Sequence, residues 1–419
     1  MNTSTDKLEA IEAIQKKLVG KRLSYEEIYT IMSELAKDNL GDVLTTFFAA
    51  SFFKEGFNED ELYFMTKAMV ETGDKLRFTG IVADKHSIGG IAGTRTTMIV
   101  VPIIAAAGYK IPKTSSRAIT SPAGTADVME VLAPVTFAPA QIQSMVKKTG
   151  GCIVWGGKLG IAPADDVIID VEEELSFESI EKVIVSIMAK KVAAGTNHLI
   201  LDLPIGPTLK LKNKAQAEKM AEMFETIARR FKIKTVIDIN TMSEPAGYGV
   251  GPVLEAIDVL KVLEQDPNRP HDLEKKALRL AGKLLQICYE TEKSELDGAT
   301  VAAELLTSGK ARDAFYQIIE AQGGNKSVTS RNLKTAQFSH TICSSKHGTI
   351  VGVDNFHLNS LAKVLGAPTD QKAGLYLHKK THDPVHKADE LLTIYSSSTN
   401  AIQEAIETIK QFPIYEISS

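Results

Sequence analysis

The sequence predicts a multidomain α/β protein in which N-terminal helices precede a region with a mostly parallel sheet and a small C-terminal α+β lobe. Helical periodicity runs through the first 70 or so residues. From Ile81, short apolar runs end in Gly, Ser or Lys and alternate with helical segments, which is typical of βα units. Because 419 residues exceed what one compact core usually holds, two or three domains are expected.

Apolar spacing and start signals both predict consecutive helices at the N-terminus. The apolar residues at helical spacing are Leu8, Ile11, Ile14 and Leu18. Ser24 with Glu27, and Asn58 with Glu61, have the spacing of capping boxes, in which two side chains satisfy backbone N–H groups at a helix start.

Five strands are predicted in the α/β region: 81–84, 111–115, 152–155, 199–203 and 235–239. Between the third and fourth lies a helical stretch, Ser179 to Ala194, whose composition suits the early helices, so it is expected to pack back on them. After about Lys334 the pattern is strand-like again, as in Thr349 to Val353 and Gly374 to Leu377, with one helix near Leu358 to Leu365. This part is interpreted as a separate α+β lobe.

Composition restricts the classes of function. The formal net charge is −4 and the pI is near 6.2, so no overall positive field favours nucleic acid or an anionic membrane. Cys152, Cys288 and Cys343 are odd in number and lack metal-ligand spacing, which favours a reducing compartment. The sequence has no signal peptide and no run of about 18 apolar residues, so a cytoplasmic protein is expected.

Two loops carry the residue types that bind phosphate. Residues 84–90 (DKHSIGG) follow a predicted strand and precede a helix near Arg95, so glycine backbone N–H groups, a lysine and a serine could surround an anion. Residues 113–125 (KTSSRAITSPAGT) also follow a strand and carry hydroxyl groups, an arginine and a lysine. Both loops would meet at the carboxyl ends of the sheet, where open α/β folds bind ligands. Tight turns with solvated polar side chains are the alternative interpretation.

These segments resemble the thymidine and pyrimidine nucleoside phosphorylase family. Lys85 to Gly90, Ser115 to Thr125 with Asp127 and Glu130, residues 162–165 (APAD) and residues 186–191 (SIMAKK) occur in that family's order and spacing. The likeness covers nearly the whole chain. The run from Ser116 to Thr125 looks like the AMP phosphorylase branch, and a looser likeness to anthranilate phosphoribosyltransferase is also visible.

The resemblance implies the nucleoside phosphorylase/phosphoribosyltransferase fold. It has a small all-helical domain of residues 1–70 with 162–195, a larger α/β phosphate-binding domain of residues 71–161 with 196–333, and a C-terminal α+β lobe of residues 334–419. It also implies a pentosyltransferase that uses inorganic phosphate as co-substrate, with no cofactor and no metal. The expected partners are a nucleoside or nucleoside monophosphate, phosphate and a second copy in a homodimer, but neither nucleic acid nor membrane.

The resemblance further assigns residues to the site. The phosphate ligands would be Lys85, Ser87, Thr97, Ser115 and Thr125. The nucleotide would contact Gly90, Ser116, Arg117, Ala118, Ile119, Thr120, Ser121, Thr125, Ser186, Lys190 and Lys210. The catalytic residues would be His86 near the reacting centre, Lys190 beside the base, and Glu178 as proton donor to the leaving base. Ser186 and Lys190 are four residues apart and would share one helix face.

Two departures from the family bear on substrate and assembly. Asp170 stands where the family has a base-holding arginine, and an aspartate there could accept from the exocyclic amino group of adenine or cytosine. AMP phosphorylases carry an extra N-terminal domain that promotes assembly, whereas this sequence starts at the helical domain. A dimer is therefore expected in preference to a higher assembly.

The expected reaction is phosphorolysis of a nucleoside 5′-monophosphate such as AMP or CMP to free base and ribose 1,5-bisphosphate. The alternatives are a thymidine or pyrimidine nucleoside phosphorylase, a phosphoribosyltransferase, and a non-enzymatic binding scaffold. A phosphoribosyltransferase would need carboxylates for a magnesium diphosphate, and Asp165 with Asp166 is the nearest pair. His378, His382 and His386 are interpreted as loop residues.

Overall fold

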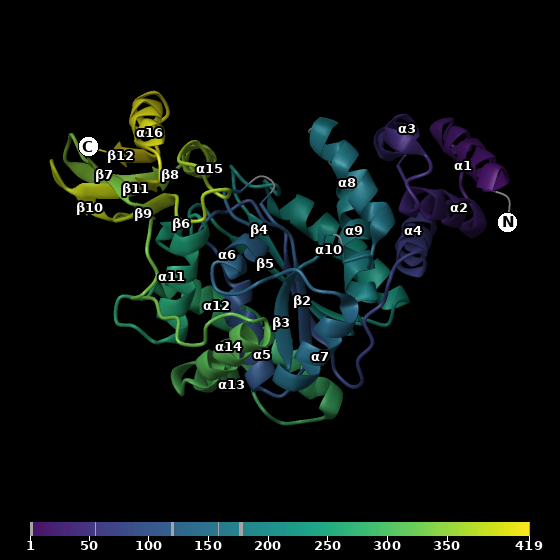
Figure 1. Cartoon of the computed structure of the whole chain (residues 1–419), viewed down its shortest axis with the longest axis horizontal. Coiled ribbons are helices and arrows are strands. Elements are labelled where there is room, and N and C mark those ends of the chain that lie inside the picture. Colours follow the sequence, from purple (N-terminus) through teal and green to yellow (C-terminus); the bar gives the residue numbers. More distant parts are fainter. Residues whose placement is uncertain (1–2, 55, 119–120, 158, 176–178, 419) are drawn as a thin grey trace.

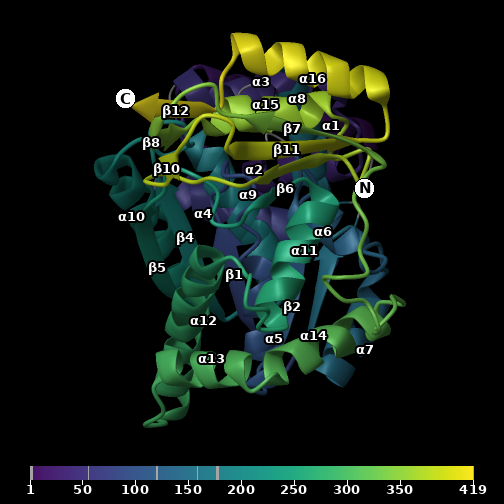
Figure 2. The same ribbon diagram turned by 90° about the vertical axis from the view of Figure 1, so that its left-hand side faces the viewer.

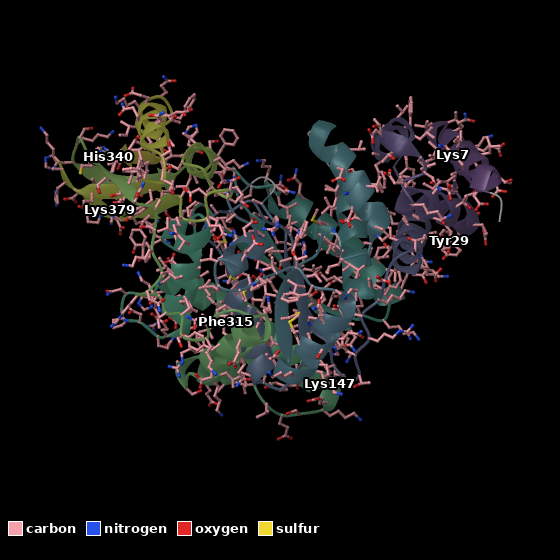
Figure 3. All side chains as sticks on the ribbon, in the orientation of Figure 1. Lys7, Tyr29, Lys147, Phe315, His340 and Lys379 are labelled. Carbon is pink, nitrogen blue, oxygen red and sulfur yellow. The ribbon has the colours of Figure 1, made fainter. Side chains whose placement is uncertain are left out.

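The computed structural model describes residues 3–54, 56–118, 121–157, 159–175 and 179–418. They form a helical domain, a central α/β domain and a C-terminal lobe, with the helical domain and the lobe on opposite sides (Figure 1). The surface residues Lys7 and Tyr29 accordingly lie at one end of the molecule, and His340 and Lys379 at the other (Figure 3). The predicted fold class is confirmed. Within the described part of the chain, no helix combines the length and apolar character needed to cross a membrane.

The helical domain combines the N-terminal helices with two helices from the middle of the chain. Its elements are α1 (Thr3–Leu18), α2 (Tyr25–Ala36), α3 (Gly41–Lys54), α4 (Glu59–Glu71), α8 (Pro163–Leu175) and α9 (Ile180–Ala193). Both predicted capping boxes are present at the starts of α2 and α4. Helix α9 packs on α4, and α8 packs on α2 and α3, which confirms that the middle helices return to the early ones.

The central sheet is parallel, with its strands in the order β3-β2-β1-β4-β5. The strands are β1 (Ala83–Ser87), β2 (Ile111–Ser115), β3 (Gly151–Trp155), β4 (His198–Ile205) and β5 (Lys234–Thr241). A bridge between Val82 and Lys110 joins the β2-β3 pair to the other three strands. The surrounding helices are α5 (Thr97–Ala106), α6 (Thr125–Glu130), α7 (Pro139–Thr149), α10 (Lys214–Arg230), α11 (Pro252–Leu263), α12 (His271–Glu292), α13 (Gly298–Thr307) and α14 (Lys310–Ala321).

Strand β1 differs from its sequence prediction, because it includes residues 85–87 that were assigned to a loop. The apolar run ends at Ala83, but Lys85, His86 and Ser87 continue the strand by pairing with Ile200 to Asp202 of β4. These polar residues form a strand because their side chains have buried partners in distant parts of the chain. Local sequence does not reveal such partners.

Three chain segments cross between the helical and α/β domains, and they lie side by side. They are residues 72–82, 159–162 and 194–197, called the seam below. The N–H of Asp74 donates to the carbonyl of Gly160 at 2.7 Å, and the N–H of Leu76 donates to the carbonyl of Ala193 at 2.8 Å. A Cβ on Gly73 would lie 2.7 Å from the carbonyl carbon of Ile161, so glycine permits this close approach.

The C-terminal lobe contains two antiparallel sheets and two helices. Its elements are β7 (Phe338–Cys343), β8 (Gly348–Val353), α15 (Asn355–Val364), β9 (Gly374–Leu377), β10 (Pro384–Val385), β11 (Glu390–Ser396), α16 (Thr399–Gln411) and β12 (Tyr415–Ser418). Figure 2 shows α15 and α16 above β11, and α15 also packs on β9. The glycine-rich residues 247–251 (GYGVG) are typical of a turn before α11. They nevertheless contain the short strand β6 (Gly249–Val250), because it pairs with β9 from the distant lobe.

Candidate active site at the carboxyl ends of the parallel strands

Lys85 on β1 is almost fully buried, with only 2% of its surface exposed. Its Nζ donates to the hydroxyl oxygens of Thr96 at 3.0 Å and Thr97 at 3.3 Å, and lies 3.8 Å from Asp202 Oδ2. Burial lowers the pKa of Lys85 to about 8, although the charge of Asp202 opposes this shift. The amine is thus held in one place at the start of α5.

Asp202 organises this face of the sheet, and the sequence analysis missed it. It lies beside Ser87 in the parallel register, and its Oδ2 accepts from the Ser87 hydroxyl at 2.7 Å. Its Oδ1 accepts from Lys276 Nζ at 2.9 Å and from Asn240 Nδ2 at 2.8 Å. Burial would raise the pKa of Asp202, but Lys85 and Lys276 lower it overall. Because a serine hydroxyl has one proton, Ser87 can donate to phosphate only when it no longer donates to Asp202.

The other face of β1 carries Asp84 and His86, because side chains alternate along a strand. Asp84 is fully buried and pairs with Lys191 of α9 at 2.6 Å, while Lys113 of β2 lies 3.6 Å away. Burial, followed by the charges of Lys191 and Lys113, lowers the pKa of His86 well below its usual value. Burial lowers the pKa of Lys113 to about 7. His86 is therefore a neutral imidazole at physiological pH.

The loop after β2 is fixed by Asp127, whose Oδ2 accepts from the backbone N–H groups of Ala118 at 2.6 Å and Gly124 at 2.8 Å. The N–H of Ala126 donates to the carbonyl of Ser116 at 3.2 Å, which closes the loop at its base. A Cβ on Gly124 would lie 2.3 Å from the carbonyl carbon of Arg117, so only glycine fits there. The loop is compact, and the predicted residues Ile119 and Thr120 lie outside the described residues.

Individual residues of this loop differ in their freedom to bind a ligand. The Ser115 hydroxyl is buried and, within the described structure, has no hydrogen-bond partner, which suits a donor to phosphate. Thr125 Oγ1 accepts from Arg95 at 3.2 Å, and Ser121 Oγ donates to the carbonyl of Ala123 at 2.9 Å. Ser116 is exposed.

Arg117 is already held by carboxylates. It bonds to both Glu130 oxygens at 2.6 and 2.7 Å and to Asp127 at 3.0 Å, and its guanidinium lies 5.0 Å from the centre of the Trp155 ring. The hydrogen bond to Glu130 is the main cause that raises the pKa of Arg117. Trp155 packs against the backbone of Gly157, where a Cβ would lie 2.7 Å from the ring.

The helical domain presents Ser186 and Lys190 from one face of α9, as predicted. Both contact Asp165 of α8: the Ser186 hydroxyl donates to Oδ2 at 2.7 Å, and Lys190 Nζ lies 2.7 Å from the same oxygen. Lys182 lies 3.5 Å from the other oxygen. Burial would raise the pKa of Asp165, but Lys190 and Lys182 lower it to about 2. Asp165 thus holds Ser186 and Lys190 in fixed positions relative to each other.

The remaining predicted residues are placed as follows. Gly90 lies beside the loop after β4, where a Cβ on it would be 3.9 Å from the backbone nitrogen of Lys210, an exposed residue. Asp170 lines a small cavity with Asp38, Asp42, Val167 and Val171, so it faces α3 and not α9. Glu178 lies outside the described residues.

Three histidines of the lobe, His378, His382 and His386, lie outside helices and strands, as predicted. Among the described residues, no three His, Cys, Asp or Glu side chains gather as they would around a metal ion.

Three family models match successive parts of the chain. The helical bundle domain of a glycosyl transferase family matches residues 11–73, its a/b domain matches residues 79–312, and the pyrimidine nucleoside phosphorylase C-terminal domain matches residues 349–415. The chain belongs to this glycosyl transferase family.

Within the family, relatives that cover most of the chain bear the names of phosphorylases. A protein named "Putative thymidine phosphorylase" from Legionella pneumophila (strain Corby) is 40% identical over 96% of this chain and 77% of its own length. The AMP phosphorylase of Thermofilum pendens is 42% identical over 96% of this chain and 76% of its own length, and that of Methanocaldococcus jannaschii is 41% identical over 96% and 79%. The chain is a pentosyltransferase of the nucleoside phosphorylase class.

Solved structures with the same fold include two anthranilate phosphoribosyltransferases. That of Thermus thermophilus superposes with a TM-score of 0.61 at 19% identity, over 74% of this chain and 99% of its own. That of Saccharomyces cerevisiae, solved with PRPP and Mg, has a TM-score of 0.59 at 14% identity, over 75% and 98%. At these identities the likeness shows the fold alone.

Proposed function

We propose that the protein uses inorganic phosphate to cleave the N-glycosidic bond of a nucleoside 5′-monophosphate such as AMP or CMP, giving free base and ribose 1,5-bisphosphate. One observation supports a substrate with a 5′-phosphate: two lysines that differ in burial lie at the same edge of the sheet. Lys85 is buried within β1, and Lys210 is exposed beside Gly90. A buried cation suits the reacting phosphate, and an exposed one suits the phosphate monoester of a substrate that enters from solvent.

The chemistry follows from the placement of these groups. A phosphate oxygen bonds to C1′ while the bond from C1′ to the base nitrogen breaks, and the electron pair of that bond stays with the base. The base takes up one proton, for which Glu178 is the proposed donor. Lys85 and Ser115 hold phosphate, and Lys190 donates to the base as it gains negative charge. Ser186 can donate to the base only when its hydroxyl no longer donates to Asp165. His86, being neutral, can lie near the developing positive charge of the sugar without repelling it.

A thymidine or pyrimidine nucleoside phosphorylase is the second candidate, and a specific observation favours it. Arg117 is bound to Glu130 and Asp127, so it is not available as a second ligand for the 5′-phosphate. Asp170 faces Asp38 and Asp42, which removes the proposed contact to an exocyclic amino group. The relatives bear both names, thymidine phosphorylase and AMP phosphorylase. Release of base from a nucleoside decides between them.

We also propose that the protein is a homodimer and that it is cytoplasmic. Val43 and Phe47, one turn apart on α3, are 70% and 51% exposed, and Leu8 on the neighbouring α1 is 60% exposed. Apolar side chains grouped in this way favour a protein partner, and a second copy is the simplest one. The measurement is the molar mass in solution, and a monomer at micromolar concentration contradicts the dimer.

The substrate proposal is tested by comparing kcat/KM for AMP with adenosine, and for CMP with cytidine, at saturating phosphate. We expect the monophosphate to be preferred in at least one pair, and Lys210→Ala to remove most of that preference, because the alanine cannot contact the 5′-phosphate. The matched control is Lys212→Ala, an exposed lysine whose Nζ donates to the carbonyl of Pro207. Preference for the unphosphorylated nucleoside in both pairs overturns the proposal in favour of a nucleoside substrate.

A further inference from the structure

A buried ion pair joins the strand that carries the phosphate-binding lysine to the helix that carries the base-facing residues. Asp84 Oδ2 of β1 and Lys191 Nζ of α9 are 2.6 Å apart, and the two residues are 0% and 2% exposed. The pair bridges the α/β domain and the helical domain.

The pair is adjacent in sequence to both halves of the site. Lys85 follows Asp84, and Lys190 precedes Lys191, so each member of the pair is one residue from a proposed ligand-binding lysine. Lys85 extends from the opposite face of β1, towards Asp202, and Lys190 extends towards Asp165. A displacement of Lys191 relative to Asp84 must therefore move the base half of the site relative to the phosphate half.

Asp84 is held in place from its own domain. Its Oδ1 accepts from the backbone N–H of Lys85 at 2.7 Å and lies 3.6 Å from Lys113 Nζ. Within the described residues, the hydrogen bond that reaches Asp84 from the helical domain comes from Lys191 Nζ. Buried ion pairs add little net stability over apolar residues of the same size, but they fix geometry, because a buried charge left without its partner is strongly unfavourable.

The ion pair also lies close to the seam between the two domains. The N–H of Thr196 donates to the carbonyl of Lys191 at 3.1 Å, and the N–H of Asn197 donates to the carbonyl of Val82 at 2.9 Å. The pair thus lies beside the point where α9 passes into the seam. If the domains rotate about the seam, residues close to it move least. Ser186 lies more than one helical turn further from the seam than Lys191, so it moves more.

We propose that Asp84 and Lys191 are positioning residues that couple the two halves of the site. When phosphate binds at β1, the effect of its binding passes through this ion pair and orders α9 for the base. The proposal rests on the proposed function for the identity of the ligands. It assigns no contact with substrate to either residue.

The experiment uses inorganic phosphate alone and measures hydrogen exchange of the backbone amides of α9, with no substrate turnover. In the wild type, saturating phosphate should slow exchange across α9 by roughly fivefold or more, the lower end of typical coupling between sites. In Lys191→Met this slowing should be lost, while phosphate still slows exchange at the start of α5, beside Lys85. Lys191→Arg, which keeps the charge and donors, should restore part of the slowing on α9.

The matched control is Lys17→Met, which removes another buried ion pair but one that lies inside the helical domain. Lys17 Nζ is 3.0 Å from Glu61 Oε1, and the side chains are 4% and 2% exposed. This variant should lose stability and keep the response of α9 to phosphate. If Lys191→Met fails to fold, Asp84→Asn is measured in its place.

Three results would overturn the inference: an α9 that ignores phosphate in the wild type, a Lys191→Met that responds as the wild type does, or a Lys17→Met that loses the response equally. Release of base in the presence of phosphate is measured separately on the wild type. Its absence removes the proposed function and leaves the exchange result on α9 to be judged by itself.

Discussion

Replacing Lys85 by methionine should remove most phosphorolytic activity while leaving the protein folded. The amine is fixed by Thr96 and Thr97 and has no role on the protein surface. A preorganised charged donor to a reacting anion stabilises the transition state by about 2.7 to 4 kcal/mol. The expected loss in kcat is therefore on the order of a hundredfold to a thousandfold. The apparent KM for phosphate should rise as well.

The effect on stability should be small, because the lysine is unfavourable where it lies. Its pKa falls from 10.5 to about 8 on burial, which corresponds to about 3 kcal/mol against the charged form at neutral pH. Methionine removes this penalty but also loses two hydrogen bonds, worth about 1 kcal/mol each. Asp202 keeps Lys276 at 2.9 Å. The free energy of unfolding at pH 7 should therefore change by no more than about 2 kcal/mol in either direction.

The sign of the pH dependence gives a second measurement. Because the folded-state pKa is lowered, the unfolded chain binds more protons between pH 8 and 10.5, and the wild type gains stability over that window as the pH rises. Lys85→Met should lack this rise. Urea melts at pH 7 and pH 10, with phosphate-dependent release of base at pH 7, test all three points. Unchanged phosphorolysis refutes the phosphate cradle, and a loss above about 4 kcal/mol at pH 7 refutes the stability argument.

Three further predictions concern other parts of the site. Glu178→Gln should impair release of a purine base more than Glu178→Asp if the carboxyl group donates the proton; equal rates would remove the residue from the mechanism. Gly124→Ala should raise KM for the nucleotide substrate at least about tenfold, because its Cβ would lie 2.3 Å from the Arg117 carbonyl carbon, whereas Gly89→Ala, with open space around it, should not. Asp165 has a pKa of about 2, so its stabilisation is fully present above the unfolded value of 3.8 and is lost as pH falls through 2. Asp165→Asn should thus destabilise by roughly 2 kcal/mol at pH 7 and by nothing near pH 2, as urea melts can show.

Most strands could be predicted because they are apolar runs. β2 of the parallel sheet and β9 of the C-terminal lobe have the predicted bounds. The pattern of apolar and polar residues gave a wrong prediction where pairing with a distant strand determines the structure. Residues 85–87 read as a polar loop, yet they form strand because β4 supplies both the ladder and the buried partner Asp202. Residues 249 and 250 read as a turn because their partner, β9, lies more than a hundred residues away.

Short sequence motifs could propose candidate site residues, but they could not reveal the buried partners that distant parts of the chain supply. Lys85 on β1, Thr97 at the start of α5 and Ser115 at the end of β2 could be proposed from local sequence with the family resemblance. Asp202, Asn240 and Lys276 come from three other elements, and no local pattern links them to residue 87. A signal was nevertheless available, because Asp202 is a lone acidic residue within the apolar strand 198–205 (HLILDLPI). A buried charge in such a run requires a partner.

The seam has a consequence for how the chain can be cut. The helical domain is linked to the α/β domain by three segments of the same chain. Backbone hydrogen bonds from Asp74 to Gly160 and from Leu76 to Ala193 hold these segments together. A protease that cleaves one of these segments leaves the other two intact, so the nicked protein should still migrate as one particle under native conditions and separate only on denaturation. For the same reason the helical domain cannot be exchanged between relatives as one contiguous block, because α8 and α9 would stay behind with the sheet.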